Sequence, residues 1–500
     1  MNLYTAQEMK KIDRDTTTQF GIEGLELMER AGCQVAEIIA SQYPKHHSVG
    51  IVCGKGNNGG DGFVTARYLS ERGFQNVALF LLLQKGELKG DALAHFKKIN
   101  LEKVKIFESG ELEKLKNYSI IVDAILGTGL EETVNDPYKQ VIHFINALQK
   151  EVIAIDIPSG LSSETGEPQG ASIHAKITVT LGGVKIGTVL NQASPYVGQL
   201  YVRDIGIPSS LLKSNKKLLT KERIRSLLPK REPQAHKNKF GHVLALGGSS
   251  GMEGAIQMTA LSALRVGCGL VSVTSFTKLT PSHLEIMYHK LPYLFWKRKL
   301  KKILAEKNVV AVGPGLGQSK KANALIRSLL KEFRGSMVMD ADALNCLSTL
   351  QQDPNIIKKI KDLPKKPVLT PHLGEFSRLT HYAKMEIEKN RVDLAAEFSK
   401  KWNVILVLKG SGTVIAEPGG EIWINPTGNP GMASAGMGDV LTGMIAGFIA
   451  QGLSSYEAAQ LGVYLHGLAG DILKEEKGDA GLIATDIIEK LPETLQTLKK

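Results

Sequence analysis

Short apolar runs that end in glycine-rich turns, each followed by a helical pattern, recur along this chain and constrain its fold more than any other feature. The expected strands are residues 49–53, 77–83, 120–126 and 152–157 in the first half, and residues 309–312, 336–339, 367–370 and 404–408 in the second. Residues 66–73 and 141–150 have helical patterns, and a longer one covers residues 6–43. Strands that alternate with helices favour a parallel sheet covered by helices on both faces. We therefore predict an α/β chain of three-layer α/β/α domains.

A change in composition marks the expected domain boundary. The 500 residues are too many for one ordinary hydrophobic core, so two or three domains are expected. Residues 209–239 are basic and polar, and Pro229 and Pro233 interrupt them. The alternation of strands and helices then restarts. We place the boundary near residue 220 and predict domains over residues 1–215 and 225–500.

Charge and cysteine usage limit the classes of function. The formal net charge is +12, but the lysines are spread along the chain, which favours a solvated basic surface over a nucleic-acid-binding patch. No cysteine pair or Cys/His cluster has zinc-site spacing, and isolated cysteines of this kind fit a reducing cytoplasm. The N-terminus lacks the apolar run of a signal peptide, and no segment is apolar for long enough to cross a membrane. We expect small-molecule partners, no nucleic acid and no membrane.

The glycine-rich residues 425–443 have the pattern of an anion-binding loop. A backbone with few side chains lets amide N–H groups approach a phosphate, and the following helix adds free N–H donors and a positive dipole end. Asp439 stands at the start of that helix, where a carboxylate is favoured. It is either a base that deprotonates a hydroxyl attacking the phosphate, or a residue that only caps the helix.

Three polar loops follow strands in the first half. Their polar residues are Asn57, Asn58 and Asp61 within residues 54–62, Asp123 before residues 127–129, and Asp156 with Ser159 after a third strand. Because the carboxyl ends of parallel strands meet at one edge of a sheet, we expect these loops to form one pocket. Oxygens of Asn58, Asp123 and Ser159 would enclose a hard cation there, unless these side chains serve only their own turns.

Further loops after strands suggest a second site in the second half. They are residues 313–317, residues 339–345, residues 369–379 and the strand–turn–strand pattern of residues 408–415. Together with residues 425–443 they form the expected rim of this site. His372 lies in one of these loops, and it either contacts a substrate or packs within the loop.

Three motifs of the first half occur in an order typical of one enzyme family. They are GKGNNGGDG at residues 54–62, VDAILGTG at residues 122–129 and AIDIPSG at residues 154–160. Residues 1–210 thus resemble the epimerase domain that acts on hydrated NADH and NADPH, with a Rossmann-like fold. The resemblance implies interconversion of the two C6 epimers of the hydrated ring, with potassium held by Asn58, Asp123 and Ser159.

The same resemblance implies a set of substrate contacts. They are Asn57, Asn58, Gly59, Gly60, Asp61, Gly127, Thr128, Gly129, Leu130, Glu131, Glu132, Thr133, Tyr138 and Asp156. Asp156 either performs acid/base work or orients ribose hydroxyls. A basic residue is common in this family where Glu131 and Glu132 stand, a departure that bears on phosphate contacts.

Three motifs of the second half are equally specific as a set. They are HKNKFGHVLALGGS at residues 236–249, TPHLGEF at residues 370–376 and GNPGMASAGMGDVLTG at residues 428–443. Residues 225–495 resemble the ADP- or ATP-dependent NAD(P)H-hydrate dehydratases, which have a ribokinase-like fold. The resemblance implies magnesium, substrate contacts from Ala255, Gly315, His372 and Asp439, and nucleotide contacts from Lys409, Gly410, Ser411, Gly412, Thr413, Gly436 and Gly438. Met437 and Ser434 depart from the residues usual in the family.

The two resemblances together imply a bifunctional repair enzyme. The first domain would interconvert the R and S hydrates, and the second would dehydrate the S form at the expense of ADP or ATP, with Asp439 as the base. Two alternatives stay open: a kinase of a small vitamin-precursor alcohol, and a first domain that only binds or regulates. We also expect a homo-oligomer.

Overall fold

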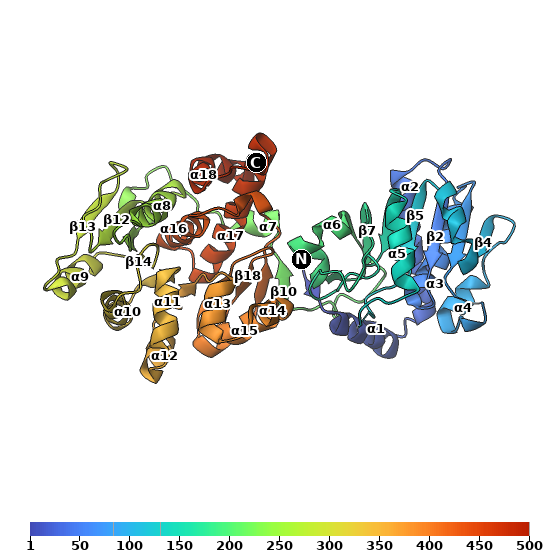
Figure 1. Cartoon of the computed structure of the whole chain (residues 1–500), viewed down its shortest axis with the longest axis horizontal. Coiled ribbons are helices and arrows are strands. Elements are labelled where there is room, and N and C mark those ends of the chain that lie inside the picture. Colours follow the sequence, from blue (N-terminus) through green and yellow to red (C-terminus); the bar gives the residue numbers. More distant parts are fainter. Residues whose placement is uncertain (84, 131, 500) are drawn as a thin grey trace. The chain divides into compact units, whose positions relative to one another are not determined.

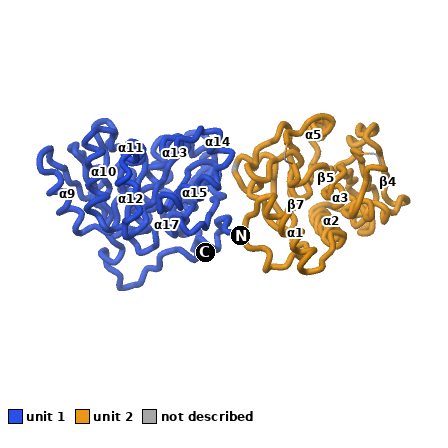
Figure 2. Tube along the Cα trace, turned by 90° about the horizontal axis from the view of Figure 1, so that it is seen from below, with its two compact units in different colours: residues 1, 215–500 blue, residues 2–214 orange. Residues whose placement is uncertain are grey.

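The computed structural model describes residues 1–83, 85–130 and 132–499, and it consists of two compact units (Figure 2). The N-terminal unit contains Asn2–Ser214, and the C-terminal unit contains Met1 and the chain from Asn215 onward. Strand β10 (Lys216–Leu218) and helix α7 (Lys221–Leu227) occupy the stretch around the expected boundary. Both elements belong to the C-terminal unit, so this unit begins about ten residues before the predicted start of the second domain.

The N-terminal unit is built on a parallel sheet that has seven strands within the described residues, in the order β4-β3-β2-β5-β6-β7-β9. The strands are β2 (Val49–Cys53), β3 (Val77–Leu81), β4 (Val104–Glu108), β5 (Ile120–Ala124), β6 (Glu151–Ile155), β7 (Ile177–Leu181) and β9 (Gln199–Arg203). A separate parallel pair joins β1 (Leu3–Tyr4) and β8 (Val184–Lys185). Successive strands run outward from β2 on one side and from β5 on the other. This is a doubly wound, Rossmann-like topology, whose switch point lies between β2 and β5.

Helices cover both faces of this sheet (Figure 1). Ile51 and Val122 belong to a core that includes side chains of α2 and α3, whereas Val52 and Ile121 belong to a second core that includes side chains of α5. Adjacent residues of one strand thus enter different cores, as a sheet buried on both faces requires. The helices are α1 (Ala6–Phe20), α2 (Gly24–Gln42), α3 (Asn57–Glu71), α4 (Gly90–Phe96), α5 (Tyr138–Ala147) and α6 (Ser194–Val197).

The long helical pattern of residues 6–43 forms two helices rather than one. Gly21 has a φ of 69° and ends α1, and its N–H donates to the carbonyl of Thr17. A left-handed residue of this kind stops a helix at low cost only when it is glycine. The chain then turns and restarts as α2 at Gly24.

The C-terminal unit is built on a mixed sheet with ten strands among the described residues, in the order β10-β19-β18-β17-β16-β15-β14-β11-β12-β13. Neighbouring strands are parallel except for the antiparallel pairs β17–β18 and β18–β19. The remaining strands are β11 (His242–Leu246), β12 (Leu270–Ser275), β13 (Met287–Lys290), β14 (Val309–Val312), β15 (Ser336–Met339), β16 (Val368–Leu369), β17 (Ile405–Leu408), β18 (Val414–Ala416) and β19 (Ile422–Ile424). The expected hairpin of residues 408–415 is thereby confirmed.

Helices on two sides complete the three layers of this unit. The main core joins the sheet to α8, α16, α17 and α18, and Figure 1 shows α10 to α13 on the opposite side. The helices are α8 (Glu253–Arg265), α9 (Trp296–Leu304), α10 (Lys320–Glu332), α11 (Asp342–Leu350), α12 (Pro354–Lys361), α13 (Leu373–Thr380), α14 (Lys384–Lys389), α15 (Arg391–Trp402), α16 (Met437–Ala450), α17 (Ser455–Lys477) and α18 (Ala484–Lys499). No helix among the described residues has both the length and the apolar character that a membrane span needs.

Candidate active sites

A cavity of about 860 Å³ lies in the N-terminal unit, where the loops after β2, β5 and β6 meet. This is the edge at which doubly wound sheets bind ligands. The structure brings ten of the predicted substrate residues to its wall: Asn57, Asn58, Asp61, Gly127, Thr128, Gly129, Leu130, Glu132, Tyr138 and Asp156. Glu131 lies outside the described residues.

Three predicted substrate residues do not line this cavity. Thr133 is exposed beyond it, and Gly59 and Gly60 are buried in the first turn of α3. A Cβ atom on Gly59 would lie 2.0 Å from the carbonyl oxygen of Gly54, and one on Gly60 would lie 2.4 Å from Sδ of Met28. The motif therefore needs these two glycines for the packing of α3 against the preceding loop and against α2.

The residues expected to hold a cation form one hydrogen-bonded cluster. The backbone N–H of Ser159 donates to Asp123 over 2.7 Å, and its hydroxyl donates to Asp123 over 2.5 Å and lies 3.1 Å from the carbonyl oxygen of Leu126. The side-chain amide of Asn58 donates to the same carbonyl over 3.0 Å. Asp123 is fully buried, and burial raises its pKa to about 6.

Asp156 is held in a strained and specific position by Lys185. Its φ is 65°, a left-handed value that is uncommon for a residue other than glycine. Its carboxylate pairs with Nζ of Lys185 and accepts the N–H of Leu181 over 3.0 Å. Lys185 is only 2% exposed, and its Nζ also donates to the carbonyl of Leu181. The sequence reasoning missed this lysine; a charged residue among the apolar residues 177–189 was its only signal.

Two further carboxylates and three cations share the wall of the cavity. Burial raises the pKa of Asp13 to about 6 and raises that of Asp61 well above its ordinary value, with the charge of Asp156 adding to both shifts. Lys10, Arg14 and Lys55 line the same cavity. The sequence reasoning missed Asp13 and these cations, most of which come from α1. The cavity therefore offers both proton-carrying groups and positive charge for phosphates.

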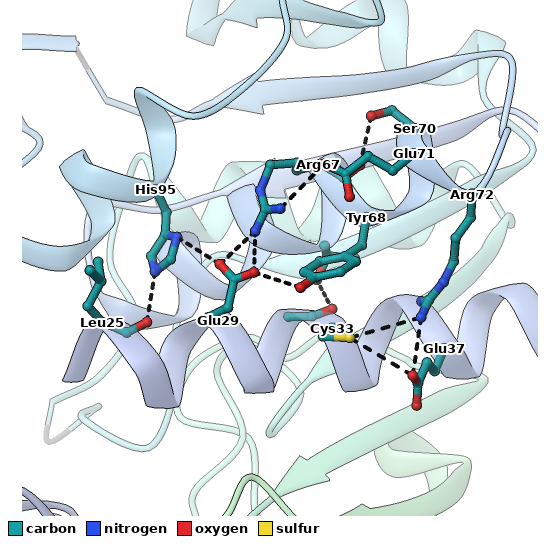
Figure 3. A network of polar contacts seen from close by, with 12 residues as sticks. Leu25, Glu29, Cys33, Glu37, Arg67, Tyr68, Ser70, Glu71, Arg72 and His95 are labelled. Carbon is teal, nitrogen blue, oxygen red and sulfur yellow. Dashed lines mark hydrogen bonds and ion pairs between the residues drawn. The ribbon is translucent and has the colours of Figure 1, made fainter. Parts of the chain in front are cut away.

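A network outside the cavity wall joins the helices α2, α3 and α4 (Figure 3). Glu29 accepts hydrogen bonds from Arg67 over 2.6 Å and from Tyr68 over 2.7 Å, and it lies 3.4 Å from Nδ1 of His95. The other ring nitrogen of His95 lies 3.0 Å from the carbonyl oxygen of Leu25. These contacts tie α3, which carries the glycine motif, to its two neighbours.

The second site is a cluster of carboxylates around one lysine in the C-terminal unit. Nζ of Lys409 lies 2.8 Å from Asp340 and 4.0 Å from Glu375. The second oxygen of Asp340 accepts the hydroxyl of Thr442 over 2.8 Å. Burial raises the pKa of Asp439 to about 7, with the charge of Asp340 as the next cause and Lys409 opposing it. An aspartate with this pKa can take up a proton near neutral pH.

The glycine turn before α16 leaves backbone amides open beside these charges. Gly436 has a φ of 89°, and α16 begins at the next residue. A Cβ atom on Gly438 would lie 3.0 Å from Nζ of Lys409 and 3.4 Å from Asp340. Asp439 is the third residue of the helix, where a carboxylate is favoured. The glycine turn and the acid are therefore arranged as the prediction requires, and anion binding by this loop stays a prediction.

The predicted nucleotide residues 409–413 divide into two groups. Lys409 projects into the carboxylate cluster, because the buried charge of Asp340 needs a partner.

The turn that follows Lys409 is held by Arg391, whose guanidinium donates to the carbonyls of Leu408 and Ser411 over 2.9 Å and 3.0 Å. Burial lowers the pKa of Arg391 to about 10. Within this turn the hydroxyl of Thr413 donates to the carbonyl of Gly410. Gly412 has a φ of 65°.

The remaining predicted substrate residues lie in two places. Ala255 and Gly315 are neighbours, since a Cβ atom on Gly315 would lie 3.4 Å from that of Ala255. His372 caps α13: its Nδ1 accepts the N–H of Gly374 over 3.0 Å, and Glu375 accepts the backbone N–H of His372 over 2.8 Å. The imidazole is 55% exposed. His372 thus has a capping role, and its second ring nitrogen, Nε2, lies 3.4 Å from Oε1 of Glu375.

Comparisons with known proteins identify relatives for both units. Two family models match, described as "NAD(P)H-hydrate dehydratase" over residues 243–493 and "YjeF-related protein N-terminus" over residues 24–187. Proteins described as bifunctional NAD(P)H-hydrate repair enzymes match the chain in Moorella thermoacetica (40% identity, 100% of this chain, 98% of the relative), Coxiella burnetii (38%, 98% and 98%) and Escherichia coli (35%, 98% and 93%).

A solved structure extends the likeness to the fold of the C-terminal unit. It is the ADP/ATP-dependent NAD(P)H-hydrate dehydratase of Bacillus subtilis, co-crystallised with ATP and Mg²⁺. Its TM-score is 0.50 at 31% identity, and the match covers 57% of this chain and all of that one. A ribokinase-like protein from Enterococcus faecalis matches with the same TM-score at 28% identity, over 57% of this chain and 97% of that one. The chain belongs to the family of bifunctional NAD(P)H-hydrate repair enzymes.

Proposed function

We propose that this chain interconverts the R and S forms of hydrated NADH and NADPH in its N-terminal unit and dehydrates the S form in its C-terminal unit, at the expense of ADP or ATP. The observation that carries the proposal is Asp439, a carboxylate with a pKa of about 7 that stands between a glycine turn and Lys409. The kinase alternative has less support, because the matching family model and relatives are repair enzymes.

In the dehydration, Asp439 removes the proton from the C6 hydroxyl of the hydrate. The hydroxyl oxygen forms a bond to the terminal phosphorus of the nucleotide. The bond between that phosphorus and its bridging oxygen breaks, and the rest of the nucleotide leaves with this oxygen. Amides of the turn and the charge of Lys409 stabilise the negative charge on the transferring group. The ring nitrogen lone pair then expels phosphate from C6, a proton leaves C5, and the reduced nicotinamide is restored.

Magnesium fits this site as a nucleotide-bound ion. Such an ion is usually held by phosphates with one or two protein carboxylates, and Glu375 and Asp340, which lie around Lys409, would supply them here. When bound, magnesium would neutralise phosphate charge. The nucleotide itself would lie against the turn of residues 410–413.

In the epimerisation, Asp156 is our candidate for the acid/base group. Departure and return of water at C6 requires a group that gives and takes a proton. Lys185 fixes the position of the Asp156 carboxylate at the cavity wall. Lys10, Arg14 and Lys55 at the cavity wall would bind the phosphates of the hydrate.

Potassium fits the cluster of Asn58, Asp123 and Ser159. All three offer oxygen atoms, and the carboxylate of Asp123 is buried with hydrogen-bond donors but without a cationic partner among the described residues. A hard monovalent cation would balance that charge and fix the loops after β5 and β6. A reducing compartment and a homo-oligomeric state remain predictions from the sequence.

Recovery of absorbance at the reduced-nicotinamide band tests the proposal. Mixed R and S hydrates are incubated with the enzyme, magnesium, potassium and ADP, and then with ATP, beside an enzyme-free control. We expect full recovery of both epimers, no recovery with Asp439→Asn, and recovery of only the S fraction with Asp156→Asn. No recovery by the native chain with either nucleotide would refute the proposed function.

A further inference from the structure

The anion-binding loop is seated on α17, a helix far from it in the sequence. A Cβ atom on Gly467 would lie 2.3 Å from the hydroxyl of Thr427 and 2.6 Å from its carbonyl carbon. One on Gly470 would lie 2.2 Å from Sδ of Met432. The loop therefore touches the helix backbone itself, and the hydroxyl of Thr427 donates to the carbonyl of Tyr464 over 2.9 Å.

One side chain of α17 holds the start of this loop by two bonds. Oδ2 of Asp471 accepts the backbone N–H of Gly428 over 2.9 Å, and Oδ1 accepts the side-chain amide of Asn429 over 2.9 Å. Asn429 cannot turn its amide around at no cost, because its oxygen accepts the N–H of Gly431 over 3.0 Å. Asp471 thus faces two donors whose directions are already fixed.

The same helix also reaches the start of α16. Burial and then the charge of Lys409 lower the pKa of His466 to about 4, so the ring is neutral at neutral pH, beside the start of α16 at Met437. Nε2 of His466 is buried and has no hydrogen-bond partner among the described residues. Helix α17 hence lies against both ends of the loop. The residues of α17 that place it there are Tyr464, His466, Gly467, Gly470 and Asp471.

We propose that Asp471 is a positioning residue of the dehydration reaction: it fixes the loop from Gly428 onward, so that the amides of residues 435–438 at the end of this loop meet the transferring phosphoryl group. This inference rests on the proposed function of the C-terminal unit. In this proposal Asp471 acts through its hydrogen bonds from Gly428 and Asn429 and not by contact with the reacting groups. A displacement of such amides by about 1 Å can slow the reaction by about a hundredfold, because they stabilise the transition state only in their preorganised positions.

An exchange of two side chains tests this role. An asparagine side chain has a single acceptor oxygen, so Asp471→Asn leaves one of the two donors without an acceptor. The NH₂ group of the new side chain would then face the NH₂ group of Asn429. The double variant Asn429→Asp with Asp471→Asn restores the pattern, because the new carboxylate accepts from Gly431 and from the new amide. Glu475→Gln, on the exposed side of the same helix, is the matched control.

The full-length chain is assayed for kcat and for the KM of ADP, with epimerisation as an internal control. We expect Asp471→Asn to lower kcat by about 10- to 100-fold with a smaller change in KM. The exchanged pair should return to within about threefold of the native kcat, and Glu475→Gln should match the native enzyme. An exchanged pair as slow as Asp471→Asn alone, or Asp471→Asn with native kcat, would overturn the inference.

Hydrogen exchange separates this inference from the proposed function. If the native chain does not dehydrate the hydrates, the proposed function is refuted. The exchange rates of the loop amides can still be measured in that case. Amides of residues 428–436 should exchange faster in Asp471→Asn than in the native chain, and at the native rate in the exchanged pair. Equal exchange in all three proteins would contradict the positioning role whatever the reaction is.

Discussion

Asp439→Asn should make the C-terminal unit more stable while it abolishes dehydration. The ordinary pKa of an aspartate is 3.8, and that of Asp439 is raised to about 7 by burial and by Asp340. Below about pH 4 the carboxyl is protonated in the folded and unfolded chains alike, so its ionisation costs nothing. As the pH rises from about 4 to 7, only the unfolded chain ionises, and the free energy of unfolding falls.

The size of the effect follows from that difference. At 1.36 kcal/mol for each pKa unit, a rise from 3.8 to about 7 corresponds to about 4 kcal/mol at pH 8 and about 1.6 kcal/mol at pH 5. Asp439 is partly accessible to solvent, which screens the charge, and asparagine has its own cost of burial. We therefore expect a net gain of about 2 kcal/mol for Asp439→Asn at pH 8, and less than half of it at pH 5.

Thermal and urea unfolding between pH 5 and 8 measure this gain. The transition of the C-terminal unit is assigned as the one that saturating ADP moves upward, because a ligand stabilises only the unit that binds it. Asp439→Asn should unfold later than the native chain, by a margin that grows with pH. Parallel pH profiles for the two proteins would refute the raised pKa of Asp439 and the destabilising effect of its charge.

The remaining predictions concern catalysis, ions and packing. Dehydration by the native chain should fall about tenfold for each pH unit below about 7, as Asp439 becomes protonated, and should level off above it; a flat rate profile from pH 5.5 to 8 would contradict this. Lys185→Met should leave Asp156 unpaired, destabilise the N-terminal unit by about 3 to 5 kcal/mol and stop epimerisation, whereas dehydration of the S hydrate continues; chromatography of the two epimers checks this. Replacement of potassium by tetramethylammonium should slow epimerisation alone, and an unchanged rate would argue against the cation site. Gly59→Ala should lower the unfolding free energy of the N-terminal unit by about 2 kcal/mol or more, because its Cβ meets the carbonyl of Gly54; native stability in urea would count against that reading.

The strands of the first and second halves and the loops that follow them could be predicted well, because each depends on local sequence. Strands β14 and β15 coincide with the expected residues 309–312 and 336–339, since a fully buried strand is a continuous apolar run. Loops after strands likewise carry their own glycines and acids. The break at Gly21 was missed, because a single glycine within an apolar pattern does not reveal its φ.

Charge partners could not be predicted, because they come from elements distant in the chain. Lys185 and Asp156 are 29 positions apart, and Lys409 and Asp340 are 69 apart. The residues around Asp156 and around Asp340 do not indicate which distant lysine pairs with each carboxylate. The sequence placed Lys409 with the nucleotide turn, yet its side chain lies with Asp340, since a buried carboxylate without a partner is costly.

The glycines of α17 allow the loop to pack closely, and they also affect the stability of the helix itself. Gly462, Gly467 and Gly470 lie in the interior of this helix, and each weakens its intrinsic propensity by about 1 kcal/mol relative to alanine. A segment with three such residues is a poor helix by itself, and it depends on the structure packed against it. The loop supplies that structure at Gly467 and Gly470. Helix and loop therefore gain order together, so a ligand that stabilises the loop would also stabilise the helix behind it.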